Sequence, residues 1–119
     1  MASQGRRLIR ADALADPGAA AFTIEAPGGA RGRPRHLFAV RVDERIAVFV
    51  NACPHAWARL DQGAEGFFGL DGVYLVCSLH GAEFRPWDGL CVSGPCRGQR
   101  LERVPFRLVD GWVEVDAAN

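Results

Sequence analysis

The sequence predicts a small all-β protein, an antiparallel barrel or sandwich that carries one inserted subdomain. Short runs of alternating apolar residues recur along the chain, and 14 Gly and 7 Pro interrupt them at short intervals. No segment shows the sustained periodicity of a long helix. With 119 residues, 49% of them hydrophobic, the chain can bury one core, so residues 1–119 are expected to form a single domain.

The N-terminal elements follow from turn and strand signals. Asp12 can cap a short turn over residues 13–16, which Pro17 and Gly18 then end. Residues 20–25 alternate as a strand does, and a loop rich in Gly, Pro and Arg follows over residues 26–35.

The remaining strands are expected in hairpins. Residues 36–42 and 45–50 flank Asp43-Glu44 and predict one hairpin. Residues 103–109 and 112–115 flank Asp110-Gly111, a strong signal for a two-residue turn. Between the hairpins, residues 73–77 predict a strand after the Asp71-Gly72 turn, and residues 51–98 are interpreted as the inserted subdomain.

Composition excludes several classes of function. The 14 basic residues balance 14 acidic ones, which argues against general nucleic-acid binding. All the basic residues are Arg, so neither Schiff-base nor P-loop lysine chemistry is available. No segment approaches the about 18 apolar residues of a membrane span. The arginines of the first ten residues precede no apolar signal segment, so we expect a cytoplasmic protein.

Two short motifs combine Cys with His. The first box is Cys53-Pro54-His55, and the second is Cys77-Ser78-Leu79-His80, followed by Gly81. In a cytoplasmic protein, cysteines serve as metal ligands or thiols more often than as a disulfide framework. Thiolate and imidazole donors on two converging loops predict a metal site formed by Cys53, His55, Cys77 and His80.

Two metal groups fit this donor set. Two Cys and two His can hold a tetrahedral zinc ion, or a 2Fe-2S cluster in which two His replace two Cys on one iron. Zinc fingers usually pair Cys with Cys and His with His, whereas each box here is mixed. A mixed box suits the cluster, because each loop then gives one Cys to one iron and one His to the other.

The two boxes, a Gly-x-Cys-x-x-Gly-Pro segment and the closing hairpin resemble the Rieske family of 2Fe-2S proteins over most of the chain. The resemblance implies one cluster per chain, with Cys53 and Cys77 on the inner iron and His55 and His80 on the exposed outer iron. It also implies a small antiparallel β-domain with a cluster-binding subdomain at one end. Gly94-Pro95 would form a loop that covers one side of the cluster.

The resemblance also indicates a branch of the family. High-potential respiratory members carry an extra Cys in each box, where this chain has Ala58 and Leu79. They place Ser and Tyr hydroxyls near the cluster, where this chain has Ala82 and Phe84. Because hydrogen bonds to cluster and thiolate sulfur raise the potential, we expect a value toward the lower end of the Rieske range, about −150 to +300 mV.

The expected function is therefore that of a ferredoxin, which passes single electrons from a reductase to a terminal oxygenase or another oxidoreductase. We predict no catalytic residues, and the chain is too short to hold an oxygenase's second iron site. Two alternatives stay open: a small Rieske subunit of a larger oxidoreductase, and a structural zinc module for protein interaction. The sequence identifies neither the partners nor the oligomeric state.

Several residues fall outside this interpretation. Cys91 and Cys96 are expected to be small buried residues or thiols, and a mutual disulfide is an alternative. Aromatic residues near the boxes are expected in the core, with an exposed rim for a redox partner as the alternative; they are Trp57, Phe84 and Trp87. His36 is interpreted as structural.

Overall fold

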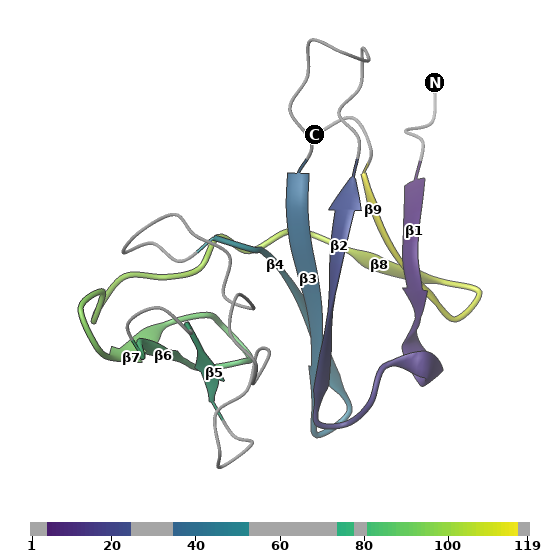
Figure 1. The fold of residues 1–119 in the computed structure, drawn as a ribbon. Coiled ribbons are helices and arrows are strands. Elements are labelled where there is room, and N and C mark those ends of the chain that lie inside the picture. The colour runs from purple at the N-terminus through teal and green to yellow at the C-terminus, as the bar shows by residue number, and fades with distance from the viewer. Residues whose placement is uncertain (1–4, 25–34, 53–73, 78–80, 117–119) are drawn as a thin grey trace, which may run out of the picture.

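The computed structural model describes residues 5–24, 35–52, 74–77 and 81–116. In these ranges the chain forms nine strands and one short 3-10 helix. The strands make three antiparallel sheets of three strands each, ordered β1-β9-β8, β2-β3-β4 and β5-β6-β7 (Figure 1). The predicted all-β class is confirmed.

The middle sheet contains the first predicted hairpin. β2 (Gly18–Ile24) pairs with β3 (Arg35–Val42), which pairs with β4 (Arg45–Val50). The turn between β3 and β4 is tight, since Asp43 and Glu44 have φ of 52° and 66°. The Asp16 carboxylate accepts hydrogen bonds from both of their backbone N–H groups, each at 2.8 Å.

The N- and C-terminal segments share a second sheet. β1 (Gly5–Arg10) pairs with β9 (Trp112–Asp116), which pairs with β8 (Arg107–Val109). The predicted Asp110-Gly111 turn joins β8 to β9, and both of its residues have positive φ, as a two-residue hairpin of this type requires.

The small sheet consists of β5 (Leu75–Val76), β6 (Glu83–Phe84) and β7 (Cys91–Ser93). Figure 1 shows it on one side of the middle sheet, with the β1-β9-β8 sheet on the other side. Three layers follow, and the middle sheet is covered on both of its faces.

The alternation of side chains along β3 and β4 divides the buried residues into two cores. Leu37, Ala39 and Val48 face the β1-β9-β8 sheet, where they pack with Val113 and Val115. The opposite face of β3 and β4 packs on the small sheet and its loops, in a core that contains Phe38, Val40, Ala47, Phe49, Leu75, Cys77, Ala82, Phe84, Cys91, Cys96 and Leu101.

The strands predicted over residues 20–25 and 73–77 are β2 (Gly18–Ile24) and β5 (Leu75–Val76), and two further elements differ more. The N-terminal turn is η1 (Ala11–Ala13) and begins earlier than predicted. Its N-cap residue is Arg10, which makes no side-chain cap, and Asp12 lies within the first turn, where its carboxylate accepts a hydrogen bond from Arg10 Nε. The predicted strand over residues 103–109 is divided between two sheets. Val104 donates its backbone N–H to Val48 of β4, whereas β8 pairs only with β9.

Candidate metal centre

Of the four predicted ligands, the structure describes Cys77. Cys53, His55 and His80 lie outside the described residues. Cys77 directly follows β5, and its side chain is fully buried in the core between the small sheet and β3-β4. The second box therefore begins at the end of a strand whose position is fixed by pairing with β6.

Backbone hydrogen bonds close the turn that contains the second box. The Gly81 N–H donates to the Cys77 carbonyl at 2.9 Å, and the Cys77 N–H donates to the Ala82 carbonyl at 2.8 Å. Gly81 has φ of 71°, in the left-handed region where glycine carries no steric penalty. These hydrogen bonds join Cys77 at the start of the box to Gly81 and Ala82, which follow it.

The predicted covering loop packs on this turn. Gly94 has φ of 103°, and a Cβ at that position would lie 2.7 Å from the Ala82 Cα. Only glycine allows so close an approach. This contact fits the covering role that the resemblance implies for Gly94-Pro95.

The two positions at which hydroxyl groups are expected in high-potential relatives are apolar and buried. Ala82 lies in the turn, and Phe84 lies in β6 opposite Leu75 and Cys91. Both side chains are 0% exposed. Neither can donate a hydrogen bond to a sulfur atom.

The described residues fit an iron–sulfur cluster. Cys77 is a buried cysteine directly after β5, and as a thiolate its sulfur can serve as a metal ligand. Its surroundings are apolar, and its backbone is held by hydrogen bonds to Gly81 and Ala82. A soft donor held in this way suits iron–sulfur ligation.

Comparison with protein families decides the identity. A family model described as the Rieske [2Fe-2S] domain matches residues 21–110. The chain belongs to this family. Its cofactor is therefore a 2Fe-2S cluster, one per Rieske domain, and its chemistry is electron transfer.

Solved structures show the same Rieske fold. The ferredoxin of carbazole 1,9a-dioxygenase from Nocardioides aromaticivorans IC177 has a TM-score of 0.70 and 23% identity, covering 96% of this chain and 98% of that one. A Sphingomonas yanoikuyae B1 ferredoxin has a TM-score of 0.68 and 24% identity, covering 95% and 98%.

The fold also occurs within a longer chain. The terminal oxygenase of carbazole 1,9a-dioxygenase from Novosphingobium sp. KA1 has a TM-score of 0.70 and 16% identity. The match covers 98% of this chain but 30% of the oxygenase chain. The comparison with curated protein sequences gives no significant match.

An ion pair that the sequence analysis missed stabilises the β6-β7 turn of this Rieske domain. Arg85 Nε donates to Asp88 Oδ1 at 3.0 Å, and its Nη2 contacts the other carboxylate oxygen. The same Oδ1 accepts the Leu90 backbone N–H at 3.0 Å. Hydrogen bonding to Arg85 and then to Leu90 lowers the pKa of Asp88 below its ordinary value. The Asp88-Gly89 dipeptide is the turn signal that could have revealed this feature.

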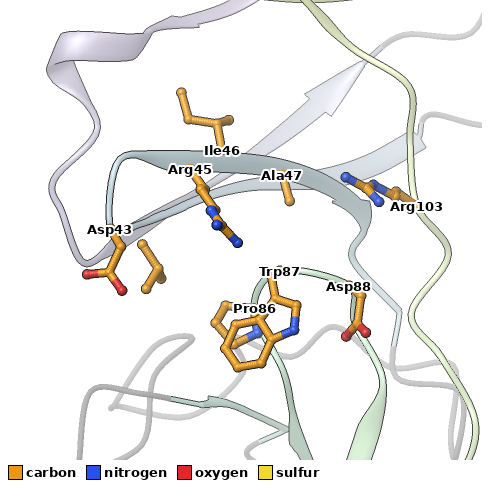
Figure 2. Close-up of a pocket in the computed structure, with 9 residues that line it drawn as sticks. Asp43, Arg45, Ile46, Ala47, Pro86, Trp87, Asp88 and Arg103 are labelled. Atoms are coloured by element: carbon orange, nitrogen blue, oxygen red, sulfur yellow. The ribbon is translucent and has the colours of Figure 1, made fainter.

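The same turn faces a cleft between the small sheet and the β3-β4 hairpin. Pro86, Trp87 and Asp88 line one side of it, and Arg45 lines the other (Figure 2). The cleft has a volume of about 870 Å³ and does not include Cys77 among its lining residues. Trp87 is 45% exposed here, so its predicted place in the core was wrong, whereas Phe84 is in the core as predicted. Trp57 lies outside the described residues.

His36 has a structural environment. It lies in β3 opposite Thr23 of β2, and its Nδ1 is 3.2 Å from the Thr23 hydroxyl. Its backbone carbonyl accepts the Asn51 N–H at 2.8 Å, which fixes the chain directly before the first box. These contacts fit the structural role that the sequence predicts.

Within the described ranges, no helix is both long enough and apolar enough to cross a membrane.

Proposed function

We propose that this Rieske protein is a ferredoxin that carries single electrons from a reductase to a terminal oxygenase or another oxidoreductase. The observation that most strongly supports this proposal is the extent of the match to the Nocardioides ferredoxin, which spans 96% of this chain and 98% of that ferredoxin. The two chains therefore share one fold over nearly all of the residues compared, and that relative is the ferredoxin of a dioxygenase.

The proposed ligands are Cys53 and Cys77 on one iron and His55 and His80 on the other. The mixed Cys-His boxes and membership of the Rieske family support this set. Cys77 is buried and is the first residue of a hydrogen-bonded turn, which further supports its assignment as a ligand. When bound, the cluster supplies a one-electron couple, and the same assignment makes residues 51–98 the cluster-binding subdomain.

The side chains around the second box set the environment of that couple. Gly94 packs on Ala82, where the resemblance places the loop that covers the cluster. Ala82 and Phe84 offer no hydroxyl donor, so the reduced state gains no stabilisation from them. This environment supports a potential toward the lower end of the Rieske range of about −150 to +300 mV.

A cytoplasmic location is also part of the proposal. The four cysteines of the chain suit a compartment in which cellular reductants keep thiols available as metal ligands.

A second candidate is a Rieske subunit bound permanently within a larger oxidoreductase. The match to about a third of an oxygenase chain favours this candidate, because it shows the same fold in a covalent assembly. A zinc module is not favoured, since the family that matches the chain is defined by its 2Fe-2S cluster.

Two measurements test the ferredoxin proposal. Anaerobic titration of the iron-loaded chain should consume one electron per chain. A Rieske oxygenase with its NADH-dependent flavoprotein reductase should then turn over only when this chain is added, at a rate that saturates with its concentration. Ala82→Glu, which places a buried charge beside the turn, should abolish both, whereas Leu108→Glu, at a 57% exposed position of β8, should change neither.

Isolation from the native host separates the two candidates. A ferredoxin elutes alone in size-exclusion chromatography with its iron content intact. Stoichiometric elution with a large catalytic chain, stable in high salt, would replace the ferredoxin proposal with the subunit candidate.

A further inference from the structure

The two cysteines outside the ligand boxes lie in direct contact. Cys91 begins β7, and Cys96 lies in the loop that follows this strand. The Cys96 thiol donates a hydrogen bond to the Cys91 sulfur across 3.0 Å, and the Cys91 thiol donates to the Ser93 carbonyl at 3.3 Å. Both side chains are 1% exposed.

Backbone hydrogen bonds hold the two cysteines in this arrangement. Cys91 donates its N–H to the Gln99 carbonyl at 2.8 Å and accepts the Gly98 N–H at 3.0 Å. Gln99 in turn donates its N–H to the Cys96 carbonyl at 2.8 Å. The loop is therefore closed by the backbone, and the sulfur atoms are neighbours before any bond joins them.

We propose that Cys91 and Cys96 form a thiol–disulfide couple, a second redox site of this chain that is distinct from the cluster and reacts with peroxide. Hydrogen peroxide oxidises one thiol to a sulfenic acid and releases water. The second thiol attacks that sulfur, the S–S bond forms, and a second water leaves. Two electrons pass from the two thiols to peroxide, and a dithiol reductant reverses the change.

The surroundings make this couple accessible to a small oxidant. Cys96 lies beneath a surface loop in which Gly94, Pro95, Arg97 and Gly98 are all exposed. Peroxide needs only a local opening of this loop to reach the sulfur atoms. No other chain is required, because Cys91 in β7 and Cys96 in the following loop are already in contact.

The disulfide would affect the second box through the contact between Gly94 and Ala82. Gly94 lies between the two cysteines in sequence and contacts Ala82, whose carbonyl accepts the Cys77 N–H. A covalent link across the base of the loop restricts the motion of Gly94, and with it the cover over Ala82. Oxidation of Cys91 and Cys96 would therefore make the packing beside the second box more rigid, although neither cysteine is a proposed cluster ligand.

Mass spectrometry of the iron-loaded chain tests the couple. The protein is reduced, freed of reductant, treated with hydrogen peroxide, and labelled with N-ethylmaleimide in denaturant. Cleavage before Asp then isolates residues 88–109, which contain Cys91 and Cys96, from residues 71–87, which contain Cys77. We expect the 88–109 peptide to carry no maleimide after peroxide and to be two hydrogen atoms lighter than the unlabelled dithiol peptide. Treatment with dithiothreitol before labelling should restore both maleimides.

The matched variants Cys91→Ala and Cys96→Ala each leave one thiol in this peptide. In these variants dimedone should trap the sulfenic acid, which the wild-type chain should convert to the disulfide. Retention of both maleimides in the wild-type peptide after peroxide would overturn the proposal. A disulfide that joins residues 88–109 to residues 71–87, or to a second chain, would overturn it equally.

Hydrogen exchange tests the effect on the loop. The amides of Arg97, Gly98 and Gln99 all donate within this loop. Oxidation should slow their exchange about tenfold or more, while the β2-β3 amides stay unchanged. Equal exchange in the reduced and oxidised states would contradict the proposed stiffening.

Discussion

The two long sheets and the small sheet are stabilised in different ways. β2, β3 and β4 have 6 to 8 residues each, and they bury alternate side chains in two cores. β5, β6 and β7 have only 2 or 3 residues. Turn hydrogen bonds, an ion pair and glycine-dependent contacts hold the small sheet in place. Both parts bury apolar side chains, since Leu75 and Phe84 of the small sheet are fully buried. The long sheets depend mainly on this hydrophobic pattern, whereas the small sheet also depends on individual groups and, in the proposed function, on the cluster.

The largest expected effect is the loss of the cluster without the loss of the long sheets. Cys77→Ala removes a proposed thiolate ligand, so iron content and visible absorption should fall to background. Far-ultraviolet circular dichroism should retain the β signal, because β1–β4, β8 and β9 do not contain this residue.

Cys96→Ala is the matched control for Cys77→Ala. It removes a second buried thiol from the same core but lies outside the boxes, so iron content should stay near that of the wild type. Full iron occupancy in Cys77→Ala, or equal loss in both variants, would show that the assignment of Cys77 is wrong.

Gly94→Ala should weaken the small sheet in particular. The added Cβ would meet the Ala82 Cα at 2.7 Å, and the φ of 103° is strained for alanine. Gly98→Ala carries similar strain with a φ of 91°, but among the described residues other than its chain neighbours no atom lies within 4 Å of its Cβ. We therefore expect Gly94→Ala to reduce the free energy of unfolding by about 2 kcal/mol more than Gly98→Ala does.

Denaturant titration and the rate of iron loss to a chelator measure this difference. Faster iron release from Gly94→Ala than from Gly98→Ala would link the Ala82 contact to the box. Equal values for the two variants would contradict the packing described for the covering loop.

A smaller effect is expected on the potential. Phe84→Tyr restores the hydroxyl of high-potential relatives beside the second box. One hydrogen bond is worth about 1 kcal/mol, which corresponds to a rise of about 40 mV for a one-electron couple. Phe106→Tyr adds the same hydroxyl to the core on the other side of the middle sheet and should leave the potential unchanged. An unchanged or lower potential in Phe84→Tyr would contradict this explanation of the low value.

The smallest effect concerns Asp88. Its folded pKa lies below the ordinary value, so the carboxylate stabilises the fold above its unfolded pKa of about 3.9. That contribution is lost as the pH falls through the folded pKa. Asp88→Asn should therefore be less stable than the wild type near neutral pH by under about 1 kcal/mol, with the gap closing in acid. A constant gap between about pH 2 and pH 7 would contradict the role of ionisation.

The long sheets were largely predictable from the sequence. The β3-β4 and β8-β9 hairpins follow from apolar runs around Asp43-Glu44 and Asp110-Gly111. β1 was missed because Arg residues occupy half of its six positions and hide its alternation, and it gains stability from the distant β9. The division of the strand predicted over residues 103–109 was missed because its apolar pattern continues from the part that bonds to β4 into β8, which pairs with β9.

The ligand types of the candidate site could be predicted from the sequence, but the strands and contacts that hold the site in place could not. Cys and His at fixed spacing identify the boxes without any structure. β6 and β7 are too short for periodicity to reveal them. The contact of Gly94 with Ala82 and the contact between the two thiols join loop positions whose approach depends on the folded backbone.

The central claim is that two cysteines and two histidines hold one 2Fe-2S cluster in this chain. Iron and acid-labile sulfide are measured per chain, together with the electron paramagnetic resonance spectrum of the reduced protein, for the wild type and for His80→Ala. The account predicts a red-brown wild-type protein with two irons and two sulfides, a signal of low average g typical of histidine ligation, and loss of the cluster in His80→Ala. A colourless protein with stoichiometric zinc, or a native spectrum in His80→Ala, would contradict it.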